Sequence, residues 1–139
     1  MNDSQNELIR YRLARAEETL DEARLLAQGY HWNAAVNRLY YACFYAVLAL
    51  LSQSDLSSSK HSGVRSLFTV HFVKTGKLPK EMARTYNDLF ERRQEGDYDD
   101  YVIFSAEDVQ SWIGTAESFV KVIKGLIHEN STENANDRQ

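Results

Sequence analysis

The chain has 139 residues, 43% of them hydrophobic and 26% charged, which is typical of one globular domain with a substantial core. Its net charge of -4 excludes binding of nucleic acid through a positive field over the whole surface, so such a contact requires a local basic patch. The single cysteine, Cys43, cannot form an internal disulfide, and the first residues lack the apolar core of a signal peptide. We therefore expect a cytoplasmic protein with no membrane association.

The first two predicted helices are joined by a short link. Small and apolar residues recur at spacings of three and four from Leu13 to Ala27, which indicates one buried stripe, and Gln28-Gly29 is typical of a helix end. The segment Asn33 to Gln53 then contains no Gly or Pro, and Arg38 is its only charged residue. A helix that is apolar on all sides is normally buried on all sides. Its charge-free run, 39–51, is shorter than the roughly 20 apolar residues that a bilayer requires, so we interpret it as the central helix of a bundle.

The third and fourth predicted helices are separated by helix-breaking residues. The third runs from about Lys60 to Lys74. The fourth begins at Pro79, because proline is tolerated in the first turn of a helix, and it is expected to end near Gly96. The acidic stretch 97–101 that follows is predicted to be a loop.

The last predicted helix is the clearest one. Ser105 opens it as a cap and two acidic residues follow, which suits the positive end of a helix dipole. From Ser131 onward the chain is polar and is expected to be disordered. The sequence therefore predicts an all-α, up-and-down helical bundle of about five helices over residues 1–130, with a disordered polar tail at 131–139.

The sequence shows no pattern for a metal or a cofactor. None of the four histidines follows a glutamate by three residues, as di-iron bundles require, and a single cysteine gives no paired zinc ligands. The segment 74–77 lacks the spacing of a phosphate-binding loop. We therefore expect no metal site and no cofactor.

Three short blocks carry a family resemblance. They are Asn37-Arg38-Leu39-Tyr40-Tyr41-Ala42-Cys43-Phe44, then Lys60-His61-Ser62-Gly63, and then Leu89-x-x-x-Arg93-x-x-x-Asp97-Tyr98. In this order and spacing they resemble the HEPN domain family, over roughly Ile9 to Ile127. The resemblance implies a helical bundle like that of nucleotidyltransferase substrate-binding subunits, which forms a homodimer and acts with a minimal nucleotidyltransferase as a toxin–antitoxin or accessory pair. Other members of the family are metal-independent ribonucleases in which two copies form one site.

The match to the ribonuclease members is partial. Those members carry an arginine, a polar residue, three or more further residues and then a histidine, and Arg93-Gln94 fits only the beginning of this pattern. Tyr98 stands where the histidine could be. Histidine exchanges protons near neutral pH, whereas a tyrosine, with an ordinary pKa of about 10, does not. We therefore predict that the protein is a binding module, which binds nucleotide or RNA without cutting it, rather than an enzyme. The alternative is a divergent ribonuclease toxin that uses Arg93 with Tyr98 or His61.

Arg93 is the main candidate for contact with a ligand. Its fork of donors could hold a phosphate, but it could equally pair with Asp97, four residues later, or with carbonyls at the helix end. Asp97 is expected to pair with an arginine or to shape the loop rather than to act as a catalytic acid. Tyr98 could contact a phosphate or a base, although burial of its ring at the base of the loop is the favoured interpretation.

Three further ligand candidates come from the first two blocks. Arg38 lies in an otherwise apolar helix and needs a partner, for which Asp97 is favoured and an acidic residue of the first helix is the alternative. Tyr40 and Tyr41 point about 100° apart, so one can belong to the core while the other, as a ligand candidate, reaches a site or a dimer partner. His61 could contact a ligand, or it could cap the start of the third helix.

Overall fold

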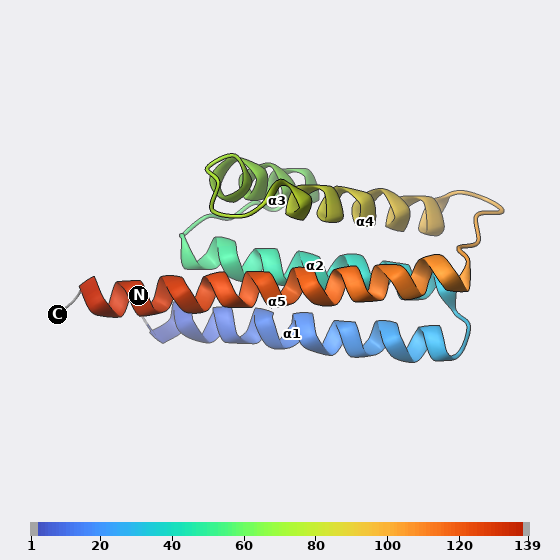
Figure 1. Ribbon diagram of the computed structural model, residues 1–139, viewed down its shortest axis with the longest axis horizontal. Helices are drawn as coiled ribbons and strands as arrows, with labels where there is room; N and C mark the ends of the chain where they lie inside the picture. The colour runs from blue at the N-terminus through green and yellow to red at the C-terminus, as the bar shows by residue number, and fades with distance from the viewer. Residues whose placement is uncertain (1–2, 138–139) are drawn as a thin grey trace.

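The protein, described for residues 3–137 by a computed structural model, consists of five α-helices and one π-helical segment (Figure 1). The elements are α1 (Asp3–Gln28), α2 (Trp32–Gln53), α3 (His61–Phe68), η1 (Thr69–Val73), α4 (Lys80–Tyr98) and α5 (Ala106–Asp137). This part of the chain contains no strand. The all-α bundle predicted from the sequence is therefore confirmed.

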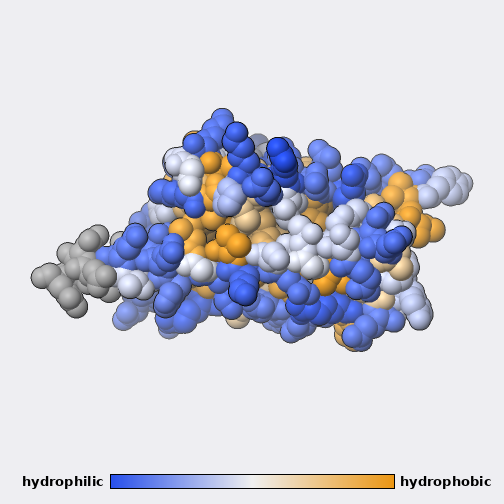
Figure 2. Space-filling model, in the orientation of Figure 1, coloured by the Kyte–Doolittle hydropathy of each residue, from blue (hydrophilic) through white to orange (hydrophobic). Residues whose placement is uncertain are grey.

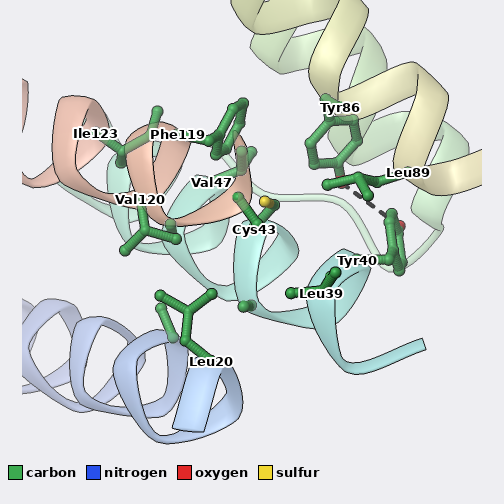
Figure 3. Close-up of a cluster of buried hydrophobic side chains, with 14 of the residues drawn as sticks. Leu20, Leu39, Tyr40, Cys43, Val47, Tyr86, Leu89, Phe119, Val120 and Ile123 are labelled. Carbon is green, nitrogen blue, oxygen red and sulfur yellow. Dashed lines mark hydrogen bonds between the residues drawn. The ribbon is translucent and has the colours of Figure 1, made fainter. Parts of the chain in front are cut away.

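Helix α2 is the centre of the bundle, and it contacts α1, α3, α4 and α5. Helices α1, α2 and α5 run alongside one another, while α3 and α4 cover the other side of α2 (Figure 1). Cys43 and Val47 of α2 are fully buried, and side chains such as Leu20 of α1 and Phe119 of α5 point towards them (Figure 3). Because neighbours cover it on several sides, this helix has few positions at which a charge would be tolerated.

The length of α2 does not by itself exclude a membrane span. The complete helix has 22 residues, with a mean hydropathy of 1.4 in its most apolar stretch, so length and composition alone would allow it to cross a bilayer. The prediction that this segment is too short to span a bilayer is therefore wrong. However, 61% of that stretch is buried inside the protein, and burial in the core accounts for its apolar character.

The connection between α1 and α2 is a tight turn. Helix α1 ends at Gln28, as predicted, but the left-handed residue is Tyr30, with φ of 64°, and not Gly29. The N–H of His31 donates to the carbonyl of Leu26 at 2.9 Å, which closes the turn across the helix end. The chain therefore reverses direction here and α2 packs back along α1.

The third predicted helix changes its winding along its length. It is α-helical only as far as Phe68, and the π-helical segment η1 follows, in which the N–H of Lys74 donates to the carbonyl of Thr69 at 2.8 Å. Both Phe68 and Phe72 are buried. The π-helical segment therefore keeps Phe72 in the core, four residues after Phe68.

Helix α4 continues past Gly96 to Tyr98, so the predicted loop at 97–101 is wrong for Asp97 and Tyr98. Gly96 does not break the helix. A Cβ atom at this position would lie 2.8 Å from Cε2 of Phe104, which means that the glycine allows the α4–α5 link to pack closely against α4. Asp97 is consequently held in the last turn of the helix, close to Arg93.

Helix α5 begins as predicted, since the Oγ of Ser105 accepts a hydrogen bond from the N–H of Asp108 at 3.1 Å. The helix then continues to Asp137, so residues 131–137 are helical, whereas the sequence predicted a disordered tail. One physical reason is the buried Gln53, whose Nε2 donates to the carbonyl of Ile127 at 2.8 Å and to Oγ of Ser131 at 3.1 Å. Residues 138–139 of the predicted tail lie outside the described part of the chain.

Candidate functional site

The candidate site is built around Arg93, which α4 holds against aromatic rings of α2. The residue is only 8% exposed. Its guanidinium carbon lies 5.0 Å from the ring centre of Tyr40, 5.7 Å from that of Tyr41 and 5.6 Å from that of Phe90. A cation within about 6 Å of a ring face is attracted by the ring quadrupole. These rings therefore fix the position of the charge without using its hydrogen-bond donors.

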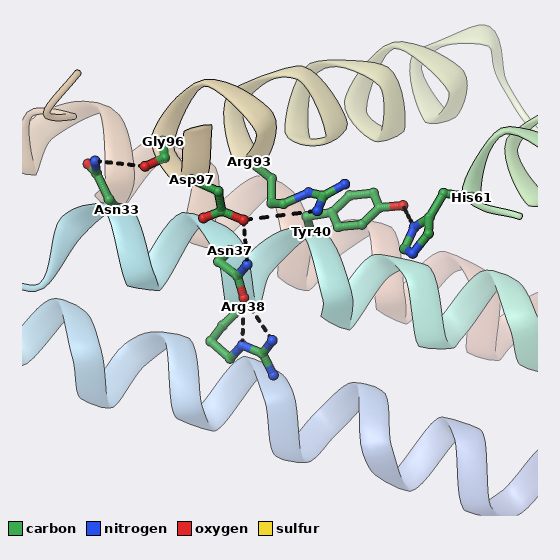
Figure 4. Close-up of polar contacts among 8 residues, drawn as sticks. All are labelled: Asn33, Asn37, Arg38, Tyr40, His61, Arg93, Gly96 and Asp97. Atoms are coloured by element: carbon green, nitrogen blue, oxygen red, sulfur yellow. Dashed lines mark hydrogen bonds and ion pairs between the residues drawn. The ribbon is translucent and has the colours of Figure 1, made fainter. Parts of the chain in front are cut away.

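Most of the hydrogen-bonding capacity of Arg93 is unused. Its only ion pair in the described residues is with Asp97, over a long 4.0 Å between Nη1 and Oδ2, and its buried Nε has no hydrogen-bond partner there (Figure 4). The same Oδ2 of Asp97 accepts a hydrogen bond from Nδ2 of Asn37 at 2.9 Å. A buried guanidinium normally satisfies its donors, so this one has donors available for an anion. The predicted pairing with Asp97 is confirmed, but it is weak.

His61, at the start of α3, belongs to the same site. Its Nδ1 is hydrogen-bonded to the hydroxyl of Tyr40 at 2.7 Å (Figure 4), and its ring stacks on Phe44 with centroids 4.5 Å apart. Burial, and secondly the charge of Arg93, lower the pKa of His61. The structure thus brings together Arg93 and His61, which are far apart in the sequence.

The hydroxyl groups of Tyr86 and Tyr40 form a chain that ends at Nδ1 of His61. Tyr86 is fully buried, and its hydroxyl has only the hydroxyl of Tyr40, at 3.5 Å, as a partner in the described residues. If Tyr86 donates to Tyr40, then Tyr40 donates to Nδ1 of His61, and the neutral imidazole carries its proton on Nε2. Burial is the main reason that the pKa of Tyr40 is raised to about 12, so this phenol keeps the proton that it donates. In this arrangement His61 offers a donor, as Arg93 does.

Arg38 does not pair with Asp97, and that prediction is wrong. Its Nη1 lies 3.6 Å from Oε1 of Glu22 in α1, which is the alternative partner expected from the sequence. Its Nε and Nη2 also donate to Oδ1 of Asn37, at 3.0 and 2.7 Å. Asn37 therefore stands between Arg38 and Asp97 and contacts both (Figure 4). Asn37 stands in the first block of the family resemblance, but the sequence does not indicate this role for it.

The two neighbouring tyrosines of α2 divide their roles as expected. Tyr40 is fully buried, whereas Tyr41 is partly exposed. The guanidinium carbon of Arg38 lies 5.1 Å from the ring centre of Tyr41, and that of Arg93 lies 5.7 Å from it. Tyr41 therefore contacts both arginines from the more exposed side of the helix.

Tyr98 lies apart from this cluster, although it follows Arg93 by only five residues. Its side chain is 73% exposed, so the predicted burial of its ring is wrong. Five residues correspond to a rotation of about 140° around a helix axis, which places Tyr98 on a different face of α4 from Arg93. Because α4 remains helical through Tyr98, this tyrosine cannot easily act together with Arg93.

Asn33 holds the end of the site in place, a role that sequence reasoning missed. Its Nδ2 donates to the carbonyl of Val102 at 2.6 Å and to that of Gly96 at 3.4 Å, and its Oδ1 accepts from the N–H of Phe104 at 3.1 Å. One amide of α2 therefore fastens the α4–α5 link and the last turn of α4. The only signal for this role in the sequence was an asparagine early in an otherwise apolar helix.

No group of three or more His, Cys, Asp or Glu residues within residues 3–137 is arranged so that it could hold a metal ion. The site is therefore defined by an arginine, a histidine and aromatic rings in the described part of the chain.

Comparison with known proteins identifies the family. The model of the HEPN domain matches residues 9–126, and the chain belongs to the HEPN domain family. Over 129 residues it is 48% identical to a UPF0332 protein of Thermotoga maritima, covering 93% of this chain and 97% of that one. It is also 32% identical to a Methanocaldococcus jannaschii protein named "Putative toxin", covering 90% of this chain and 86% of that one.

A solved structure supports the same fold. The crystal structure of ST0689, described as an archaeal HEPN homologue, matches with a TM-score of 0.69 at 21% sequence identity. The match covers 86% of this chain and 97% of that chain. The helical bundle is therefore the HEPN fold over nearly its whole length.

Proposed function

We propose that this protein is a dimeric HEPN module that holds a phosphate-bearing ligand, a nucleotide or RNA, at Arg93 and acts with a minimal nucleotidyltransferase. The observation that carries the proposal is the state of Arg93 itself. The side chain is 10% exposed, its Nε lacks a hydrogen-bond partner in the described residues, and its one carboxylate is 4.0 Å away. A phosphate oxygen would supply the acceptors that the protein does not.

The chemistry of the site fits a phosphate better than a neutral ligand. A guanidinium presents its donors in a planar fork that matches two phosphate oxygens, and hydrogen bonds between charged groups are stronger than those between neutral groups. The rings of Tyr40, Tyr41 and Phe90 hold the fork rigid, so little side-chain freedom remains to be lost on binding. Nε2 of His61 would add a neutral donor beside the fork.

The same geometry supports binding without cleavage. Cleavage of RNA without a metal needs a group that accepts and releases a proton near the reacting phosphate. If its proton is on Nε2, His61 is a donor and not a base, and its lowered pKa disfavours the charged form that would act as an acid. Tyr98 lies on another face of α4. The arrangement thus stabilises charge but provides no evident proton transfer.

The dimeric state is supported by hydrophobic side chains at one end of the molecule. Tyr30, Tyr101 and Ile103 are exposed by 77%, 101% and 80%, and all three lie in the two links at the same end of the bundle (Figure 1). Figure 2 shows hydrophobic atoms on the surface beside the α4–α5 link. Large hydrophobic side chains gathered in this way are typical of an interface, and a second copy of this chain is the occupant that we propose.

The experiment is co-purification of the tagged chain with the minimal nucleotidyltransferase encoded beside its gene, if the neighbouring gene is of that type. The variant Arg93→Gln should no longer co-purify with the nucleotidyltransferase, or its co-purification should no longer change when nucleotide is added. The matched control is Arg92→Gln, one residue away, because Arg92 is partly exposed and pairs with Glu95 at 3.0 Å. Equal retention of the partner by both variants, in the presence and absence of nucleotide, would contradict the role of Arg93.

A second candidate function is a metal-independent ribonuclease that uses Arg93 with His61. The observation that favours it is that Tyr40 holds His61 beside Arg93, so the site does contain a histidine. If Nδ1 of His61 instead donated to Tyr40, Nε2 would be free to accept a proton. RNA should then be cut in EDTA by the wild type and by the exposed control His71→Gln, but not by His61→Gln. Intact RNA in every sample would exclude this candidate.

A further inference from the structure

An open groove lies between α3, η1 and α4. Its walls include Arg65, Ser66 and Thr69 from the α3–η1 segment, Lys74 directly after it, and Asn87 and Glu91 from α4. We call it the α3–α4 groove. Its lining combines hydroxyl, amide and charged groups with apolar surface such as that of Val70, and the polar groups can hydrogen-bond a charged ligand.

Both cations of the α3–α4 groove lack an acidic partner. In the described part of the chain, neither Arg65 nor Lys74 forms an ion pair, although Glu91 lines the same groove. The guanidinium carbon of Arg65 lies 4.7 Å from the ring centre of Phe90, which holds it in place as the rings around Arg93 hold that side chain. Two cations therefore stand against one carboxylate, on a protein whose net charge is -4. The groove itself therefore has a small local excess of positive charge, which a nucleic acid would require on this acidic protein.

Phe90 connects the groove with the Arg93 site. The guanidinium carbons of Arg65 and Arg93 lie 4.7 and 5.6 Å from the centre of the same ring. The two cations are consequently no farther apart than these two distances together. A ligand that carries several linked phosphates could therefore contact both of them.

The π-helical segment shapes one wall of the groove. Its wide turn is closed by the hydrogen bond from the N–H of Lys74 to the carbonyl of Thr69, and these two residues both line the groove. A regular α-helix would place Lys74 at a different angle from Thr69. Single π-turns inside helices are frequent at functional sites. Here the turn places a cation and a hydroxyl on the same wall.

We propose that the α3–α4 groove binds the phosphodiester backbone of single-stranded RNA, with a neighbouring phosphate of the same strand at Arg93. The inference rests on the proposed phosphate site at Arg93 for the position of that neighbouring phosphate, but the groove has cations of its own. A single strand fits better than a duplex, because the partly exposed Tyr41 and Phe44 beside the site could stack with unpaired bases. The hydroxyl groups of Ser66 and Thr69 would donate to phosphate oxygens.

The test is fluorescence anisotropy of a labelled oligouridylate over a series of salt concentrations. Each cation that contacts a single-stranded phosphate contributes about 0.7 to the slope of log K against log salt, so Arg65→Gln/Lys74→Gln should reduce the slope by about 1.4 and weaken binding. Lys74→Gln alone should reduce it by about half of that amount, and this exposed side chain has no partner in the described residues whose loss would affect folding. Glu91→Gln should instead tighten binding, because it removes the one carboxylate of the groove.

Lys121→Gln, on α5 and outside the groove, makes the same change in net charge as Lys74→Gln and should leave the slope unchanged. The inference is overturned if the wild type does not bind the oligouridylate, or if the groove variants behave as Lys121→Gln does. Loss of RNA binding in Arg93→Gln but not in the groove variants would reject the groove as a binding site and retain the phosphate site at Arg93. The reverse result would reject the phosphate site at Arg93 and retain the groove. Displacement of the RNA by inorganic phosphate at equal phosphate concentration would overturn the claim of a backbone site, since it would indicate a site for an isolated ion.

Discussion

Gly96→Ala should destabilise the protein, whereas Gly114→Ala should stabilise it, although both glycines lie inside helices. In a helix interior, alanine is favoured over glycine by about 1 kcal/mol. A Cβ atom at Gly114 would have nothing within 4 Å, so this variant should show most of the gain. A Cβ atom at Gly96 would lie 2.8 Å from Cε2 of Phe104, a buried ring that packs edge-on against Trp112 with centroids 5.3 Å apart.

In Gly96→Ala, the cost of the clash with Phe104 should outweigh the gain in helix propensity from glycine to alanine. Forcing extra volume into a packed site costs about 1–3 kcal/mol, so the net change at Gly96 is a loss of about 0–2 kcal/mol. The two variants should therefore differ by about 1–3 kcal/mol in the free energy of unfolding. At roughly 2–4 °C per kcal/mol, this difference is measurable by thermal denaturation followed by circular dichroism. Equal stabilisation by both substitutions would refute the close packing of Phe104 on α4.

Three further predictions concern the charges and the assembly. Arg38→Ala should cost about 1–2 kcal/mol of stability, since the Arg38–Glu22 pair is partly exposed and stands between a surface pair and a buried one; an unchanged midpoint in urea denaturation would contradict this. Arg93→Met should raise the pKa of His61 towards its ordinary value, because the neighbouring cation disfavours the imidazolium; an NMR titration that shows no upward shift would oppose the assigned proximity. Light scattering at micromolar concentration should report about twice the chain mass of 16.0 kDa, and a monomer at all concentrations would reject the homodimer.

The fold could be predicted because its strongest signals are local. The segment around Cys43 is apolar on every side, which is typical of a helix covered by others, and Ser105 marks a helix start by its own hydrogen bond. The end of α4 could not be predicted in this way. Gly96 has a low helix propensity, and the packing of Phe104 that makes it necessary comes from a link later in the chain.

The candidate site was predictable in its residues but not in its contacts. Arg93, Tyr41 and His61 could be singled out because they stand in the three blocks that resemble the HEPN domain family. Which of them meet depends on the angle at which α4 crosses α2, and no sequence period encodes that angle. This is why the partner of Arg38 was assigned to Asp97, which is near in space but already shared between Asn37 and Arg93.

The exposure of Tyr98 shows the same limit. Its spacing from Arg93 suggested a replacement for a catalytic histidine, but a spacing of five residues brings two side chains together only if the helix ends between them. Helix α4 does not end there. His61, which comes from a different helix, contacts the same Tyr40 ring as Arg93 does and is close enough for that charge to lower its pKa.

The central claim is that Arg93 holds a phosphate-bearing ligand without cutting it. The most direct measurement incubates one end-labelled RNA in EDTA with wild type, Arg93→Gln and Arg92→Gln, and reads both anisotropy and RNA length from each sample. The account predicts that wild type and Arg92→Gln bind the RNA and leave it intact, while Arg93→Gln no longer binds it. Cleavage by the wild type that disappears in Arg93→Gln would contradict the account and assign this site to a ribonuclease.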